Sequence, residues 1–246
     1  MPLHRGANDL YDADPMSIWQ RFPNVATSLA KAGSVIGFLR GLAGSDRAPD
    51  PQNSVAFTIG LIALAAKMAK SDGVVTTDEI DAFNQVMRVA PEDADRVRQV
   101  FDLAKQDVAG FDSYARQISE LLAGDRTVLL QVLEGLFVVA AADGVLHERE
   151  EEFLRSVSDI FAIPPTEFRY VRALFVRDAG NPYEILGIAP SASDADIKAR
   201  HRKLVIQVHP DRLTGEGQSH ALIEAANRKL AAINAAFDAL RKERGF

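Results

Sequence analysis

The sequence predicts an all-α protein built from two helical domains. Apolar residues recur at helical spacing between Pro, Gly and Asp-Gly stops, and no stretch shows the alternation of β-branched and polar residues that is typical of a strand. The chain has 246 residues, of which 47% are hydrophobic and 25% are charged, the balance of an ordinary globular protein. Because single cores stop growing near this length, two modest cores are favoured over one.

Composition and charge exclude several classes of function. The chain has no cysteine, which excludes disulfides, thiolate metal sites and cysteine nucleophiles. The formal net charge of −6 argues against a general nucleic-acid binder. The charge is uneven, however, because residues 181–246 carry a net +2 and the rest of the chain carries −8. The C-terminal 66 residues are therefore expected to form a separate domain.

The N-terminal quarter is expected to lie outside the main domains. Residues 1–16 are polar and lack an apolar period, which predicts a disordered leader, and residues 17–54 form an apolar segment (17–42) followed by a linker. Lys31 interrupts the apolar segment, so a soluble or loosely docked segment is favoured over a membrane-surface helix or a true span. Dimerisation also stays open, because small residues spaced by four let helices approach closely: Gly33, Gly37 and Gly41.

The first domain is predicted over residues 55–178. Residues 55–70 are apolar on nearly every face, as expected of a central buried helix, and Asp72-Gly73 ends it. Thr76 and Glu79 then form a capping-box pattern that opens the next helix, which Pro91 ends. Further helical patterns are expected at 92–106, 111–123, 126–142, 147–161 and 165–177.

This region contains an internal repeat. Residues 69–83 match residues 140–154, so each half has a buried helix, an Asp-Gly turn and a helix with an acid in its first turn. Such a duplication is expected to pack as two related helix hairpins in one bundle. The four paired acids could also suit a hard cation, but a turn and helix-dipole role is favoured and no metal site is assigned: Asp72, Glu79, Asp143 and Glu150.

The repeat, with its Asp-Gly turns and acidic helix starts, resembles the TerB-like domain, the helical fold associated with tellurite resistance. This resemblance covers about half of the chain. It implies a small helical bundle used for association or scaffolding, with no established catalysis.

Residues 181–246 form the second predicted domain. A short helix around Tyr183 is ended by Gly187 and Pro190, and the Ser193/Asp196 pair opens a long helix to about residue 208. Its inward stripe comprises Ile197, Leu204 and Val208, with His201 between them. Its opposite surface carries three basic residues: Lys198, Arg202 and Lys203.

A proline ends the long helix and begins the connection to the next one. Pro210 forbids continuation, so His209-Pro210-Asp211 is expected to start an exposed loop that runs through Gly217. A second long helix is predicted over residues 219–241 with a matching apolar stripe. Two antiparallel helices that present a loop at their tip and a basic face are typical of a binding device.

The sequences PYEILGI, IKARHRKLVIQVHPD and INAAFDAL resemble the J domain of DnaJ-type co-chaperones over all of residues 181–246. The chain departs from the family where His201 and Val208 replace the usual aromatics and where Gln207 replaces a common Lys. A TerB-like domain before a J domain is the layout of the DjlA-like co-chaperones.

This resemblance implies docking on a DnaK-type heat-shock ATPase and stimulation of its ATP hydrolysis to assist the folding or remodelling of client proteins. Lys198, Arg202 and Lys203 would steer onto an acidic surface of that partner. Asp211 would pair with a partner arginine, Pro210 would stiffen the loop, and His209 would hold or present it. His201 is interpreted as a replacement for an aromatic at the edge of the core.

The expected function is therefore that of a co-chaperone, not an enzyme, with no cofactor and no nucleic-acid partner. The alternative is a TerB-type metal or stress-response scaffold with a degenerate J-like tail. A hydrolase that uses His209 and Asp211 is rejected, because no nucleophile elbow or metal-ligand helix occurs. The expected location is the cytoplasm, with contact to the inner face of the membrane left open for residues 17–42.

Overall fold

The computed structural model describes residues 55–71, 76–87, 89, 91, 94–104, 110–176, 181–215 and 219–246. Within these ranges every regular element is helical, which confirms the predicted all-α class. The predicted leader 1–16 and segment 17–54 lie outside the described residues. No described helix combines the length and apolar character needed to cross a bilayer. Contacts divide the described chain into two compact units, one up to Ile163 and one from Pro164 onward.

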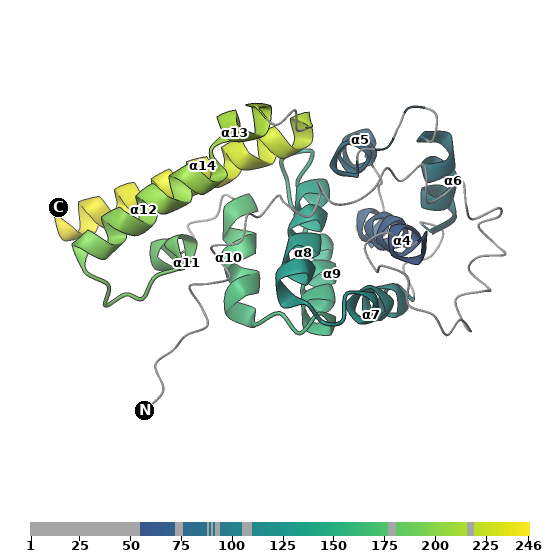
Figure 1. The fold of residues 1–246 in the computed structure, drawn as a ribbon, viewed down its shortest axis with the longest axis horizontal. Helices are drawn as coiled ribbons and strands as arrows, with labels where there is room; N and C mark the ends of the chain where they lie inside the picture. Colours follow the sequence, from purple (N-terminus) through teal and green to yellow (C-terminus); the bar gives the residue numbers. More distant parts are fainter. Residues whose placement is uncertain are drawn as a thin grey trace. The chain divides into compact units, whose positions relative to one another are not determined.

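The first unit contains helices α4 to α9 (Figure 1). Helix α4 packs against four of the others, and every residue from 57 to 69 in it is buried. A helix that is apolar on all faces is stable only inside such a shell, so the predicted central role is confirmed. The described helices are α4 (Val55–Ser71), α5 (Thr77–Val86), α6 (Ala94–Ala104), α7 (Phe111–Leu121), α8 (Arg126–Ala140) and α9 (Glu148–Ile160).

The two halves of the repeat pack across one another. Helix α4 contacts α9, which follows the second apolar helix, and α8 contacts α5, which follows the first. Each strongly apolar helix is therefore covered in part by the amphipathic helix of the other half. This cross-packing is the arrangement expected of two related hairpins in one bundle.

The paired acids Glu79 and Glu150 are both buried at helix starts. Glu79 Oε2 accepts a hydrogen bond from the Thr76 N–H at 2.7 Å, and Glu150 Oε2 accepts one from the His147 N–H at 2.9 Å. The Thr76 hydroxyl in turn accepts from the Glu79 N–H at 3.2 Å, which completes the predicted capping box. The acids that define the repeat thus have the same structural role in both halves.

In the second half of the repeat, the aspartate side chain of the turn accepts a hydrogen bond from the backbone. Asp143 Oδ1 accepts from the Val145 N–H at 2.9 Å, and Gly144 adopts a left-handed φ of +90°. Its partner in the repeat, Asp72, lies outside the described residues. Within the described ranges, no three His, Asp or Glu side chains gather as a metal site would require. The three described acids form the hydrogen bonds of caps and turns, as the favoured interpretation expects.

The second unit is organised around α14, which contacts the four other helices described in it (Figure 1). Helices α12 and α14 lie antiparallel, side by side, as the two apolar stripes predict. The helices are α10 (Pro165–Phe175), α11 (Pro182–Leu186), α12 (Asp194–Val208), α13 (Pro210–Gly215) and α14 (His220–Arg244).

Helix α10 packs within this second unit, although the sequence assigned it to the 55–178 domain. It contacts α11 and α14, and Arg169 Nε lies 3.3 Å from Glu184 Oε1 on α11. The buried Lys229 of α14 places its ammonium 5.3 Å from the centroid of the Phe175 ring. The amphipathic pattern predicted the helix correctly, but it does not specify which core buries the apolar face.

The expectation of an exposed loop from His209 through Gly217 is wrong at its start. Residues Pro210–Gly215 form the short helix α13, because proline at the first helical position lacks only an N–H that would have no helical partner there. Leu213 is buried, and the Thr214 hydroxyl donates to the Pro210 carbonyl at 3.1 Å. The proline therefore ends one helix and begins the next.

Candidate functional site

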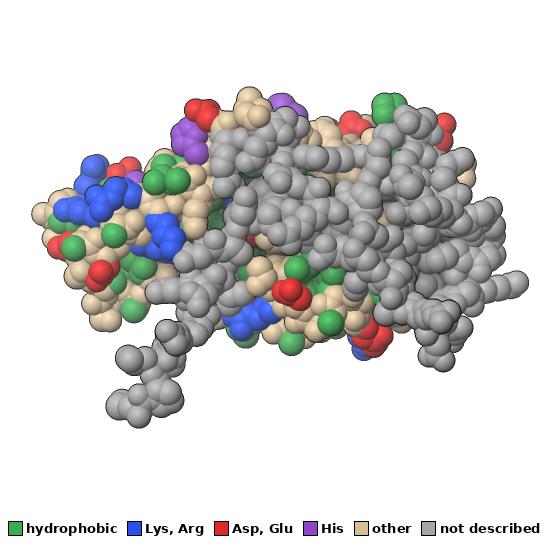
Figure 2. Space-filling view, in the orientation of Figure 1, with side chains coloured by type: hydrophobic (Ala, Val, Ile, Leu, Met, Phe, Trp, Pro, Cys, Tyr) green, Lys and Arg blue, Asp and Glu red, His purple; other side chains and the backbone are tan. Residues whose placement is uncertain are grey.

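The candidate site lies on the outer face of α12. Ile197, Leu204 and Val208 are buried, as the predicted inward stripe requires. The three predicted basic residues, Lys198, Arg202 and Lys203, are exposed. Lys and Arg side chains lie over α12 and α14 in Figure 2, with acidic side chains among them. Residues 181–246 carry a net +2 within a chain of net −6, which suits an acidic partner surface.

Arg200, a fourth basic residue of α12, has a different role. Its Nε donates to the Leu186 carbonyl at 2.9 Å, and Leu186 is the last residue of α11. Arg200 therefore ties α12 to the buried end of α11. The selection of Lys198, Arg202 and Lys203 as the outward-facing set agrees with this geometry.

The sequence analysis did not single out Ile206, which is the most exposed large apolar residue in the described ranges at 73%. It lies one turn beyond Arg202 and three residues before His209 on α12. Its position outside the inward stripe was the signal that could have identified it. The exposed face thus combines positive charge with an apolar side chain, a mixture that is typical of protein interfaces.

The His209-Pro210-Asp211 tripeptide forms the junction between α12 and α13. His209 has the extended backbone that a residue before proline prefers, with φ −62° and ψ 124°. Its Nδ1 accepts from the Asp211 N–H at 3.3 Å and lies 3.6 Å from Asp211 Oδ2. The Asp211 side chain is 89% exposed, which leaves its carboxylate available to a partner.

His201 is part of the contact between α12 and α14. Its ring stacks on Phe237 with the centroids 4.0 Å apart and the planes 11° from parallel. Its Nε2 lies 2.9 Å from Asn234 Oδ1. An aromatic residue would form the same stack, so the structure agrees with the interpretation of His201 as an edge-of-core replacement.

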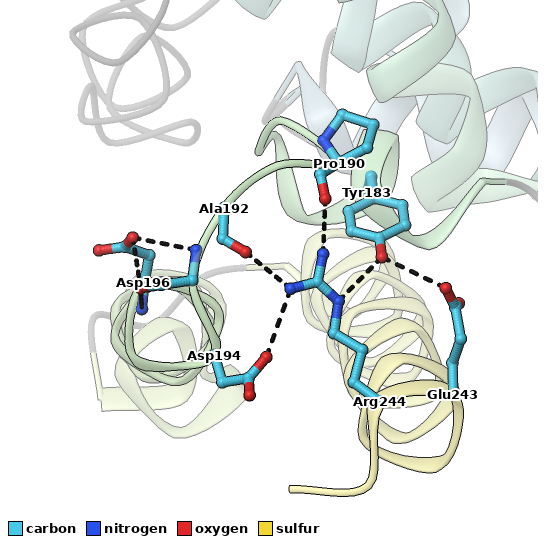
Figure 3. Close-up of polar contacts among 8 residues, drawn as sticks. Tyr183, Pro190, Ala192, Asp194, Asp196, Glu243 and Arg244 are labelled. Atoms are coloured by element: carbon cyan, nitrogen blue, oxygen red, sulfur yellow. Dashed lines mark hydrogen bonds and ion pairs between the residues drawn. The ribbon is translucent and has the colours of Figure 1, made fainter.

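Arg244, the last residue of α14, connects three segments of the second unit (Figure 3). Its Nε donates to the Tyr183 hydroxyl at 3.0 Å, and its Nη1 donates to the Ala192 carbonyl at 2.7 Å. The guanidinium also lies 3.3 Å from Asp194 Oδ1 and donates to the Pro190 carbonyl at 2.5 Å. One side chain thereby fixes α11, the loop before α12 and the first residue of α12 to the end of α14.

The environment of Arg244 favours its charged form. The hydrogen bond with the Tyr183 hydroxyl and the interactions with Asp194 raise the pKa of Arg244, against the opposing effect of desolvation. Tyr183 also donates to Glu243 Oε1 at 3.4 Å, so the phenol bridges two residues of α14. Sequence reasoning did not identify this network, because its partners are 50 to 61 residues apart in the chain.

The start of α12 carries the predicted Ser193/Asp196 capping box. The Ser193 hydroxyl donates to Asp196 Oδ2 at 2.6 Å and accepts from the Asp196 N–H at 3.2 Å. The hydrogen bond from the Ser193 hydroxyl has the larger effect and the one from the Ser193 backbone N–H the smaller. Both lower the pKa of Asp196 from its ordinary value of 3.8. The ionised carboxylate therefore helps to hold the first turn of α12.

We expect Ser193→Ala to lower the free energy of unfolding by about 1 kcal/mol at pH 7. Because the folded-state pKa of Asp196 is depressed, its contribution is present above pH 3.8 and is lost as the pH falls through the lower folded value. The difference in free energy of unfolding between the variant and the parent should therefore become smaller below pH 3.8. Urea unfolding at pH 7 and pH 3, with Ser191→Ala as the control, would show this narrowing, and an equal difference at both pH values would contradict it.

Comparison with known families identifies both domains. Residues 58–173 match the family Tellurite resistance protein TerB, and residues 181–244 match the DnaJ domain. The chain carries a TerB domain followed by a J domain. The candidate site on α12 and α13 lies entirely within the J domain. The TerB match extends into α10, the helix that packs against α11 and α14 of the J domain.

Curated relatives match nearly the whole length of the chain. The chain is 26% identical to Co-chaperone protein DjlA of Photobacterium profundum over 92% of this chain and 90% of the relative. It is 24% identical to Co-chaperone protein DjlA of Escherichia coli K12 over 94% of this chain and all of the relative. No solved structure matches the chain. These similarities confirm the predicted resemblance to the DjlA-like type.

Proposed function

We propose that this chain is a co-chaperone that binds a DnaK-type ATPase through its J domain and stimulates ATP hydrolysis by that partner. The observation that carries the proposal is the placement of Asp211: an exposed carboxylate at the α12–α13 junction, next to a helix face with exposed basic residues. The DnaJ match and the names of the DjlA relatives support the same function. In this proposal the hydrolytic site belongs to the partner, and this chain needs no cofactor.

Each part of the site has a physical role in this proposal. Lys198, Arg202 and Lys203 increase the rate of encounter with an acidic partner surface, which makes binding depend on salt. Ile206 adds apolar contact area within that face. Asp211 then forms a charge-assisted pair with a partner arginine, for which His209 and Pro210 hold the backbone. Clients would be captured by the partner after hydrolysis.

The alternative, a metal or stress-response scaffold with a degenerate tail, has less support. A degenerate tail would be expected to lose its exposed tripeptide or its core, whereas Asp211 is presented and Leu204 and Leu240 are buried. The acids Glu79 and Glu150 form helix caps. We further propose that the chain acts in the cytoplasm beside its DnaK-type partner, which fractionation of cells would test.

The proposal is tested by ATP turnover of a DnaK-type protein at increasing concentrations of this chain and at two salt concentrations. The parent should accelerate turnover. Arg202→Ala/Lys203→Ala should raise the half-stimulating concentration roughly tenfold at low salt and should weaken its salt dependence. The matched control is Arg241→Ala/Lys242→Ala, which removes an adjacent Arg-Lys pair from α14. Absence of stimulation by the parent with several DnaK-type partners would overturn the proposed function.

A further inference from the structure

Phe246 lies beneath one of the proposed partner-binding residues. The Lys198 ammonium is 4.5 Å from the centroid of the Phe246 ring, within the range of a cation–π contact. Lys198 is exposed and Phe246 is partly buried. The aromatic ring therefore supports the ammonium from the side of the hairpin and leaves its other side open to solvent.

The backbone turns at Gly245 to bring Phe246 back onto the hairpin. Gly245 caps α14 in the left-handed conformation, with φ +76°, and its N–H donates to the Arg241 carbonyl at 2.9 Å. The Phe246 ring then meets Phe237 edge-on, with the centroids 5.9 Å apart and the planes at 62°. Because this turn needs a positive φ, the position of the ring depends on glycine at 245.

The position of the Phe246 ring is stabilised by contacts of Phe237 and of Arg244, the residue before the turn. Phe237, which it contacts, is stacked on His201 of α12. Arg244, which precedes the turn, is held by the Tyr183 hydroxyl and by the Pro190 and Ala192 carbonyls (Figure 3). The end of α14 is thus anchored to α11 and to the loop before α12. Phe246 is presented to Lys198 from a rigid base.

We propose that Phe246 is a positioning residue for the partner-binding face, acting through Lys198. This inference rests on the proposed function. A lysine side chain has many rotamers in solution, and fixing them on binding costs conformational entropy. The ring restricts the ammonium before the partner arrives but does not neutralise it, as a carboxylate in the same place would. Phe246 therefore raises the affinity for the partner without itself needing to contact it.

The test measures the concentration of the chain that gives half-maximal stimulation of a DnaK-type ATPase. Phe246→Ala should raise this concentration about two- to fivefold, the range expected for an exposed cation–π contact, and should leave maximal stimulation unchanged. Phe246→Trp, which retains an aromatic face, should restore the parental value. Thermal unfolding of each variant verifies that the J domain is folded at the assay temperature.

A double-mutant cycle separates positioning from general destabilisation. Adding Phe246→Ala to Lys198→Ala should have no further effect, because the ring acts only through that ammonium. Adding Phe246→Ala to Arg202→Ala should multiply the two effects, because no contact joins Phe246 to Arg202 in this mechanism. If Phe246 had only a structural role, Phe246→Ala would raise the half-stimulating concentration by the same factor in the Lys198→Ala and Arg202→Ala backgrounds.

A backbone variant tests the same position without removing the ring. Gly245→Ala meets no atom within 4 Å but strains the left-handed turn, so it should displace Phe246 and reproduce the effect of Phe246→Ala. Gly110→Ala is the matched control, since Gly110 has φ +80° and open space in the TerB domain. It should leave the half-stimulating concentration unchanged.

The outcomes distinguish this inference from the function on which it rests. If the parent stimulates no DnaK-type partner, both the proposed function and the positioning role are overturned. If the parent stimulates but Phe246→Ala behaves like the parent, or binds more tightly, only the positioning role is overturned. Equal increments of Phe246→Ala in the Lys198→Ala and Arg202→Ala backgrounds would overturn it as well.

Discussion

Asp211→Asn is expected to reduce stimulation of a DnaK-type ATPase at least tenfold at the concentration of the chain that gives half-maximal stimulation by the parent. The substitution keeps the size of the side chain and removes only its charge. Truncating one partner of a charge pair that becomes buried in a complex costs about 2–5 kcal/mol, which exceeds the effect of any single exposed lysine. The measurement is ATP turnover of the partner, with and without the variant, at that same concentration.

The structure indicates that this loss would come from the interface rather than from misfolding. The Asp211 side chain is 89% exposed, and the hydrogen bond that orders the junction comes from its backbone N–H, which asparagine retains. The free energy of unfolding should therefore change by less than about 0.5 kcal/mol.

Asp238→Asn is the matched control, because Asp238 is an exposed aspartate on α14 that pairs with Arg241 at 3.1 Å. It should leave stimulation unchanged. Full stimulation by Asp211→Asn would remove the central contact from the proposed mechanism.

Local signals allowed the helices to be predicted from the sequence. The capping boxes at Thr76 and Ser193 both form, and each determines where a helix begins through contacts within four residues. The central position of α4 followed from apolar residues on all of its faces. Features whose causes are local in the chain were therefore recoverable without coordinates.

The features that sequence reasoning missed depend on contacts between distant residues. Arg244 reads in the sequence as an ordinary basic residue in the last turn of a helix, and its four partners become visible only when α11 and α12 are placed beside α14. The amphipathic pattern of α10 is equally compatible with burial against either unit. Helix α13 was missed because Pro210 was interpreted only as a helix terminator, although proline also favours a first helical position.

The exposure of the candidate residues was predicted from the sequence, whereas the contacts that support them were not. Lys198, Arg202, Lys203 and Asp211 are all exposed on one unit, as expected from the J-domain resemblance. What the sequence could not show is that Lys198 stands over an aromatic ring, because the cation–π pair joins residues 198 and 246 across the hairpin. Residue type and spacing predict which residues are exposed on one helix face. The conformations of their side chains depend on tertiary contacts.

The separate cores of the two units predict separable unfolding. Leu204 of α12 and Leu133 of α8 are both buried, each in a different unit. Leu204→Ala should lower the free energy of unfolding of the J domain by about 2–5 kcal/mol and should leave the TerB domain close to its parental stability. Leu133→Ala should do the reverse. Hydrogen exchange resolved by peptide, measured on the full chain, reports both domains in one experiment.

Helix α10 makes this pair of variants decisive for the domain boundary. Its contacts with α11 and α14 predict that peptides from residues 165–175 lose protection with Leu204→Ala and keep it with Leu133→Ala. The opposite pattern would assign α10 to the TerB core, as the family match to residue 173 suggests. Equal loss of protection throughout the chain in both variants would show that the two units unfold as one cooperative structure.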